Sequence, residues 1–278
     1  MLAGLSAALA AAFVFGVAAI LQARAVRRLP TSYAESAGAL VVLLRQPLLL
    51  AAVALNLVGF LLHLVALRLV PLYLAQAGIS ASLAVAALLA VLTLHERLGP
   101  LDWLAVAAVT VGLVLLAGAS GDIGGVDASG TFLTWLLAAI VAVAVGGYAV
   151  ARSRLPAAST LLGFLAGLGF AGSGIAARVL PGLTPAQLWD APAAYALPVS
   201  GGLAFILYSL ALQRGSVTVA TAPMIVMQTL TPAAVGLAVL GDGVRDGWAA
   251  VGVVGFVLTL AGAIALARFE RGPSGPEQ

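Results

Sequence analysis

Blocks of about twenty apolar residues alternate with short polar turns along almost the whole chain. A hydrocarbon core about 30 Å thick is crossed by roughly 20 helical residues. The pattern therefore predicts an all-α integral membrane protein with nine transmembrane helices. The expected spans lie near residues 2–22, 47–69, 72–94, 101–119, 132–151, 157–178, 193–212, 217–240 and 247–267.

Residues 33–45 form a further apolar block, which is too short to cross a membrane as a helix. This block contains Glu35 and ends at Arg45-Gln46-Pro47. We predict a short helix there that lies at the membrane interface. A tenth crossing by the same segment is the alternative.

The basic residues are concentrated in alternate turns, and this bias indicates the orientation of the chain. Cytoplasmic loops of membrane proteins carry an excess of Lys and Arg. With nine spans, ten of the 13 basic residues would face the cytoplasm, whereas a tenth span would reduce the split to seven against six. The bias favours nine spans, an outside N-terminus and a cytoplasmic C-terminus. The ten are Arg24, Arg27, Arg28, Arg45, Arg97, Arg152, Arg154, Arg214, Arg268 and Arg271, and the outer three are Arg68, Arg178 and Arg245.

The composition supports this class and excludes several others. Apolar residues make up 63% of the chain and charged residues 8%, against roughly 25% charged in soluble domains. The absence of cysteine excludes disulfides and thiolate metal sites. All basic residues are arginine, and Ala, Leu, Val and Gly are abundant, which indicates the codon bias of a GC-rich bacterium and hence a bacterial cell membrane. The arginines are spread over loops, so topology explains them better than nucleic-acid binding.

Two glycine patterns in the span 157–178 need separate interpretations. The run Gly167-Leu-Gly169-Phe-Ala-Gly172 matches a dinucleotide-binding fingerprint, but no strand precedes it. Gly163 and Gly167 form a GxxxG pair, which predicts close packing of two helices. The chain shows no nucleophile–base pair, and its two histidines are too few for a catalytic zinc site. We therefore expect no enzymatic activity, no metal site and no cofactor.

The two halves of the chain share features at a constant spacing. Trp103 and Trp248 are 145 positions apart, and each follows a charged turn and begins a Gly/Ala-rich span. At the same offset His63 falls on Tyr208, and earlier Arg28-Leu29-Pro30 resembles Arg154-Leu155-Pro156 at an offset of 126. Corresponding spans 72–94 and 217–240 would cross in opposite directions, which predicts two inverted repeats, as in many secondary transporters. The expected units are 1–119, with the short helix 33–45 in place of a full span, an outside loop 120–131, a second repeat 132–267 and a cytoplasmic tail 268–278.

The run Leu92-Thr-Leu-His-Glu96-Arg97-Leu98-Gly-Pro-Leu-Asp102-Trp103 resembles the signature between the fourth and fifth helices of the drug/metabolite transporter superfamily, which includes the EamA-like carriers. The segment from Arg45-Gln-Pro47 to Val70-Pro71, with nine spans and an outside N-terminus, is most similar to the NIPA-like branch. The resemblance implies a secondary carrier that works by alternating access. Members of the NIPA-like branch are described as magnesium transporters. The second repeat departs from the family pattern, because Gly241-Asp242 stands where Gly-Glu is expected.

Polar side chains inside the spans are the candidate substrate-binding residues, because polar groups in hydrocarbon are costly and mark pathways. Asn56 and His63 share one helix face, and so do Gln76 and Ser80. Thr221, Gln228 and Thr231 share a face of a helix that Pro223 and Pro232 are expected to bend. The candidate set is Asn56, His63, Gln76, Ser80, Tyr148, Tyr208, Thr221 and Gln228.

These residues predict a polar cavity near the midplane, lined by spans 47–69, 72–94, 193–212 and 217–240. Hydrogen bonding between neighbouring helices is the alternative role for each of them. His63 could carry a proton between two access states, because its ordinary pKa lies near physiological pH. A neutral imidazole bonded to a neighbouring helix is the competing interpretation.

Three functions fit the sequence in decreasing order. The first is a secondary transporter that moves a small-molecule substrate, coupled to a proton or another cation. The second is magnesium or divalent cation transport, which ranks lower because magnesium sites use carboxylates and no Asp or Glu lies in the middle of a span. The third is a non-transporting scaffold or lipid-binding subunit. The expected surroundings are the lipid bilayer, with no nucleic acid and with a homodimer left open.

Overall fold

The computed structural model describes residues 2–27, 47–94, 98–124, 130–182, 184–215 and 217–269. In these residues nine helices are long and apolar enough to cross a membrane, which confirms the predicted all-α membrane class. They are α1 (Leu2–Arg27), α3 (Pro47–Leu69), α4 (Leu72–Leu94), α5 (Pro100–Ala119), α6 (Gly130–Arg152), α7 (Ala158–Arg178), α9 (Pro192–Arg214), α10 (Val217–Ala238) and α11 (Ala249–Phe269). The five-residue helix α8 (Pro185–Trp189) precedes α9. The segment 33–45 lies outside the described residues, as does most of the predicted tail 268–278.

Prolines mark several helix starts. Pro47 is the first residue of α3, Pro100 begins α5, and Pro192 begins α9. Proline suits the first turn, because the N–H that it lacks would have no partner there. Asp102 in the first turn of α5 accepts a hydrogen bond from the Gly99 N–H at 2.8 Å. Proline and an N-terminal carboxylate therefore explain why α5 begins where the sequence predicted.

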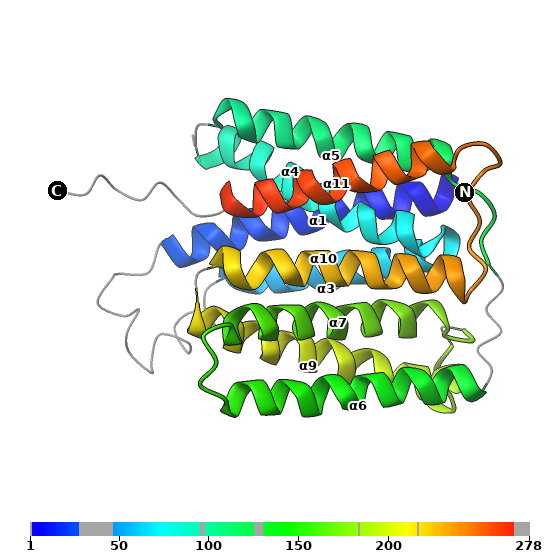
Figure 1. Cartoon of the computed structure of the whole chain (residues 1–278). Coiled ribbons are helices and arrows are strands. Elements are labelled where there is room, and N and C mark those ends of the chain that lie inside the picture. Colours follow the sequence, from blue (N-terminus) through cyan, green and yellow to red (C-terminus); the bar gives the residue numbers. More distant parts are fainter. Residues whose placement is uncertain are drawn as a thin grey trace.

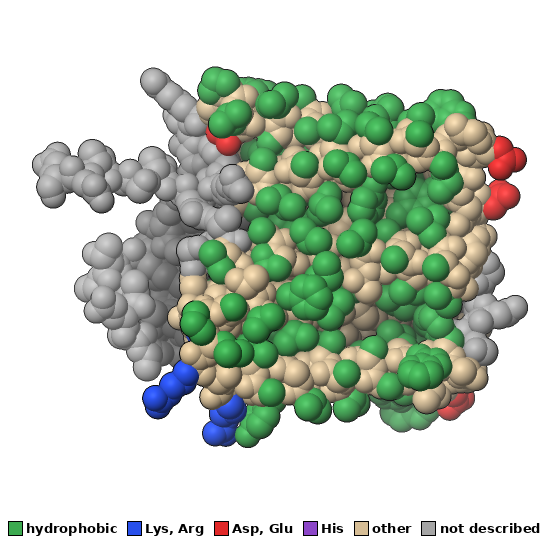
Figure 2. Space-filling model, viewed as in Figure 1, with side chains coloured by type: hydrophobic (Ala, Val, Ile, Leu, Met, Phe, Trp, Pro, Cys, Tyr) green, Lys and Arg blue, Asp and Glu red, His purple; other side chains and the backbone are tan. Residues whose placement is uncertain are grey.

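The helices run back and forth, so the bundle has two ends (Figure 1). The N-terminus lies at one end together with the α3–α4, α5–α6, α7–α9 and α10–α11 connections, and we name this the Asp242 end. The opposite end holds the α4–α5, α6–α7 and α9–α10 connections, and we name it the Arg214 end. The described arginines predicted to face the cytoplasm, such as Arg152, Arg154 and Arg214, lie at the Arg214 end. Figure 2 shows basic side chains there, and acidic side chains chiefly, though not solely, at the Asp242 end.

Helix packing follows the same scheme in the first and last parts of the chain. α1 packs chiefly against α3 and α4, and α7 packs chiefly against α9 and α10. α5 and α11 pack closely against each other, and α4 contacts α10 and α11. α6 lies at the edge of the bundle against α7 and α9 (Figure 1). The predicted offset of 126 matches α1 to α6, whereas the packing matches α1 to α7.

Small residues allow the closest helix approaches, as the GxxxG pair predicted. A Cβ placed on Gly167 of α7 would lie 2.5 Å from the Met224 carbonyl oxygen of α10, and one on Gly163 would collide with the Ala220 carbonyl. A Cβ on Gly112 of α5 would lie 2.6 Å from the Gly255 carbonyl oxygen of α11. Without a hydrophobic drive between helices in lipid, such backbone contact supplies much of the attraction. The run Gly167–Gly172 lies inside α7, where no dinucleotide loop forms.

The buried apolar residues form clusters that differ between the two ends. At the Asp242 end one cluster joins residues of α3, α4, α5, α6, α7, α9 and α10, including Leu67, Leu72 and Ile175. Toward the Arg214 end, one cluster combines residues of α1, α4 and α5 with Leu266 of α11, and a second uses only α6, α7, α9 and α10. The green surface in Figure 2 is the apolar exterior that lipid would cover.

Candidate functional site

Asp242 lies in the turn after α10, and its buried carboxylate joins several parts of the bundle. One carboxylate oxygen accepts a hydrogen bond from the Leu72 N–H at 2.7 Å, at the first residue of α4. The other accepts from the Gly124 N–H at 3.0 Å, in the α5–α6 connection, and from Arg178 at 2.9 Å. The carboxylate therefore has donors from three separate elements, which is a firmly bound arrangement for a buried charge.

Arg178, the last residue of α7, is 1% exposed and forms the matching ion pair. Its Nη1 donates to the Leu67 carbonyl at 2.8 Å and to the Val70 carbonyl at 3.2 Å, at the end of α3. Its Nη2 donates to the Gly124 carbonyl at 3.4 Å as well as to Asp242. The carbonyls at the C-terminus of α3 lack helical partners, so the guanidinium satisfies groups that otherwise need water. We name this set, with Asp242, Leu72 and Gly124, the Asp242 lock.

Backbone contacts around Asp242 hold the two adjoining loops together. Gly121 N–H donates to the Gly243 carbonyl at 3.2 Å, and Gly243 N–H donates to the Asp122 carbonyl at 2.8 Å. Tyr73, the second residue of α4, donates its hydroxyl proton to the same Gly243 carbonyl at 3.0 Å. A Cβ at Gly124 would collide with the Leu240 carbonyl, so only glycine permits this approach. The α5–α6 and α10–α11 connections are thus joined to each other and to α4.

The charge balance of this end is positive in the interior. Arg68, one residue beyond Leu67, lies within electrostatic range of Arg178. Among the described residues, Arg68 Nη1 and Arg178 Nε are buried and have no hydrogen-bond partner. Arg178 is therefore close to a second arginine, while the Asp242 carboxylate accepts three hydrogen bonds, from Leu72, Gly124 and Arg178.

The contacts at the Arg214 end are of a different kind. Arg24 of α1 donates to the Thr93 carbonyl of α4 at 2.7 Å. Arg214 of α9 donates to the Ser153 carbonyl at 3.1 Å and to the Ala151 carbonyl, in the α6–α7 connection. Among the described residues, these arginine contacts stay within one half of the chain.

The eight candidate substrate-binding residues fall into three groups. His63 of α3, Gln76 and Ser80 of α4, and Thr221 of α10 are buried. Asn56 of α3, Tyr208 of α9 and Gln228 of α10 are half-buried. Tyr148 lies apart on the outer face of α6, 63% exposed, with Arg152 5.2 Å from its ring centre.

Two contacts connect candidate residues with neighbouring helices. The Tyr208 and Thr221 hydroxyl oxygens are 2.7 Å apart, which joins α9 to α10. Gln76 packs closely against α7, because its amide nitrogen would clash with a Cβ atom added at Gly174. Such contacts fit interhelical hydrogen bonding and close packing, while the role of these residues in substrate binding stays a prediction.

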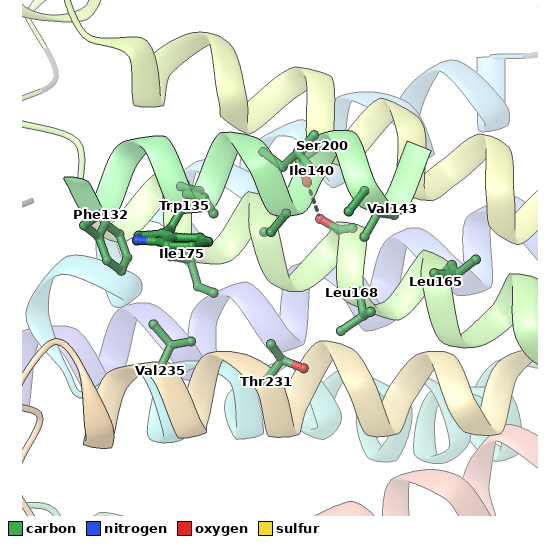
Figure 3. Close-up of a pocket in the computed structure, with 15 residues that line it drawn as sticks. Phe132, Trp135, Ile140, Val143, Leu165, Leu168, Ile175, Ser200, Thr231 and Val235 are labelled. Atoms are coloured by element: carbon green, nitrogen blue, oxygen red, sulfur yellow. Dashed lines mark hydrogen bonds between the residues drawn. The ribbon is translucent and has the colours of Figure 1, made fainter. Parts of the chain in front are cut away.

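Two apolar hollows in the described part of the bundle contain none of the candidate residues. A cavity of about 450 Å³ lies between α6, α7, α9 and α10 and is lined by Trp135, Ile140, Leu168 and Thr231 (Figure 3). Ser200 also borders it, but its hydroxyl is engaged by the Gly169 carbonyl at 2.7 Å. A second cavity of about 560 Å³ lies between α4, α5, α10 and α11. The nearly apolar walls of both suit lipid chains better than a polar solute.

Comparison with protein-family models, curated proteins and solved structures finds no match for this chain. Among the described residues, no group of three His, Asp or Glu side chains is placed to hold a metal ion.

The Asp242 lock was missed by sequence reasoning. Asp242 stands beside a turn, and Arg178 stands at the end of a span, so both were expected near the interface rather than in contact. One signal was available: Arg178 ends an apolar span on the side that carries few arginines. A buried position there requires a nearby acid, and Asp242 is one of five acidic residues on that side.

Proposed function

We propose that this protein is a secondary transporter of a small solute in a bacterial cell membrane, with its C-terminus in the cytoplasm. It would work by alternating access between two inverted repeats, as the resemblance to the drug/metabolite transporter superfamily implies. The observation that carries the proposal is the repeated packing scheme. α1 with α3 and α4 corresponds to α7 with α9 and α10, and α5 pairs with α11.

The direction of the helices supports the same conclusion. α1 leaves the Asp242 end, whereas α7 arrives at it, and the remaining pairs are opposed in the same way (Figure 1). Matching by packing gives four helices in each repeat and leaves α6 as an additional helix at the edge. Inverted repeats of this kind place the substrate between the halves, near the midplane.

Buried polar residues supply groups for a solute along the bundle, with His63 and Gln76 toward the Asp242 end and Thr221 toward the Arg214 end. His63, Gln76, Ser80 and Thr221 are buried in helices whose other core residues are almost all apolar. Such positions in transmembrane helices are functional candidates by default. The side chains offer hydrogen bonds without a net charge, which favours a neutral or zwitterionic substrate.

The first experiment identifies a ligand, and the second measures transport. The detergent-purified protein is screened for thermal stabilisation by amino acids, nucleosides, cationic drugs, polyamines and magnesium, because ligands that bind the folded state raise the midpoint. Each hit is then tested for uptake into liposomes that contain only this protein. We expect uptake above that of empty liposomes, with a marked loss in His63→Ala or Gln228→Ala.

Thr134→Ala is the matched control, because Thr134 is exposed on α6 and its hydroxyl donates to the Gly130 carbonyl of the same helix, so uptake should not change. Binding without uptake would contradict the proposal and favour the scaffold function. Equal uptake in all three variants would contradict the expected binding region while leaving transport in place.

A further inference from the structure

The Asp242 lock joins the two proposed repeats at one end of the bundle. Arg178 and Asp242 belong to the second half, at the end of α7 and after α10. The carbonyls of Leu67 and Val70 and the N–H of Leu72, which they bind, belong to the α3–α4 region of the first half. A rocking motion that separates the halves at this end must break these bonds.

The apolar packing behind the lock also crosses between the halves. Only at the Asp242 end does one cluster of the described residues draw on α3 and α4 together with α7, α9 and α10. At the Arg214 end, the cluster of Leu162 and Leu207 lies wholly in the second half. The polar bonds of the lock therefore set the Asp242 end apart, because apolar contacts between the halves also occur toward the Arg214 end, where Leu266 of α11 packs with α1, α4 and α5.

The position of the ion pair also allows it to separate. Its charges are buried beneath the end of the bundle rather than at its centre, so separation would expose both ions to water together. Removing one partner alone leaves the other charge buried without compensation, which is the costly situation. An ion pair at this depth can therefore hold the closed state firmly and still be released when both members become hydrated.

We propose that Arg178 and Asp242 are the gate that closes the Asp242 end of the transport pathway. Loss of the pair shifts the protein toward a state that is open at this end and closed at the Arg214 end. This inference rests on the proposed function, because it assigns the gate to the same alternating motion.

Distances between spin labels test the gate directly, because the chain contains no cysteine and labels can be placed at will. One pair, Leu69→Cys with Asp246→Cys, reports on the Asp242 end across the two halves. A second pair, Leu101→Cys with Gln213→Cys, reports on the Arg214 end. All four positions are exposed, so labels need not disturb the packing. Distances are measured by pulsed electron spin resonance in lipid nanodiscs.

The lock is altered by Arg178→Met and separately by Asp242→Asn, so that one misfolded variant does not remove the test. Minor states of proteins are commonly populated at about 0.1–10%, and we expect the open population to rise about tenfold or more. The first pair should gain a longer distance and the second pair a shorter one in the same samples. Arg245→Gln is the matched control, because Arg245 is exposed in the same turn and stacks on Trp248 outside the lock.

A change at the Asp242 end without the opposite change at the Arg214 end would overturn the gate, since it would show only local loosening. Unchanged distances in both variants, while the wild type transports its substrate, would also overturn the gate and leave the proposed function intact. The reciprocal change in a protein that transports nothing would support the two-state lock and contradict the transporter.

Discussion

The close approach of α7 to α10 predicts that Gly167→Ala lowers the stability of the protein. Gly167 lies where a Cβ would be 2.5 Å from the Met224 carbonyl oxygen, 2.7 Å from the Met227 Cβ and 3.0 Å from the Met224 Cα. Two of these atoms belong to the backbone of α10, so no side-chain rotation can relieve Gly167→Ala. Since ordinary contacts begin near 3.4 Å, α10 would have to move by roughly 1 Å.

Gly202→Ala on α9 is the matched control, because nothing lies within 4 Å of its added methyl group. Both substitutions gain the same helix propensity, about 1 kcal/mol for Gly to Ala. The gain in helix propensity cancels when the stabilities of the two variants are compared. The remaining difference is the cost of the steric clash at position 167. We expect Gly167→Ala to be less stable than Gly202→Ala by about 1–3 kcal/mol.

Reversible unfolding by SDS in mixed micelles, followed by the fluorescence of the four tryptophans, measures this difference. The free energy of unfolding should rise or stay constant for Gly202→Ala and fall for Gly167→Ala. If Gly167→Ala were as stable as Gly202→Ala, the close contact between α7 and α10 would be wrong.

Three further predictions concern single contacts. Arg178→Met and Asp242→Asn should each lower the free energy of unfolding by about 3–5 kcal/mol, and the double variant by less than their sum; additive losses in a double-mutant cycle would exclude the pair. Tyr208→Phe and Thr221→Val should each cost about 0.6 kcal/mol with no further loss when combined, measured in the same assay. Gly247 has a φ of +76°, so Gly247→Ala should cost about 1–2 kcal/mol and Gly247→Asn clearly less; equal unfolding midpoints for the two would refute this backbone argument.

The transmembrane helices were predictable because the bilayer imposes a length on every apolar block. Prolines at 47, 71, 100 and 192 mark where α3, α4, α5 and α9 begin, so those boundaries follow from local chemistry. The correspondence between the proposed repeats was harder to derive. Arg28-Leu29-Pro30 and Arg154-Leu155-Pro156 are alike, yet the helices before them, α1 and α6, run in the same direction. Turns at the helix ends that are predicted to be cytoplasmic share a composition whatever proposed repeat they belong to.

The polar lock could not be derived, because it depends on three-dimensional proximity between separated segments. Arg178 and Asp242 are 64 positions apart, and Leu72 is 170 positions from Asp242. Hydropathy places each of them at a helix end without saying which ends meet. The burial of His63, Gln76, Ser80 and Thr221 was easier to anticipate, since a polar residue in an apolar span faces protein rather than lipid.

The lock bears on the competing magnesium hypothesis. A carboxylate within the bundle would favour that reading, and Asp242 is such a group, 4% exposed. However, Arg178, Leu72 and Gly124 already donate to its oxygens, and Arg68 adds a second positive charge nearby. Magnesium prefers oxygen ligands that include carboxylates, and here the guanidinium occupies that position. We therefore expect millimolar magnesium to leave the melting midpoint of the wild type unchanged in the thermal screen. A magnesium-dependent rise in the wild type that Asp242→Asn abolishes would show that the ion displaces Arg178, and the cation carrier would then become the better proposal.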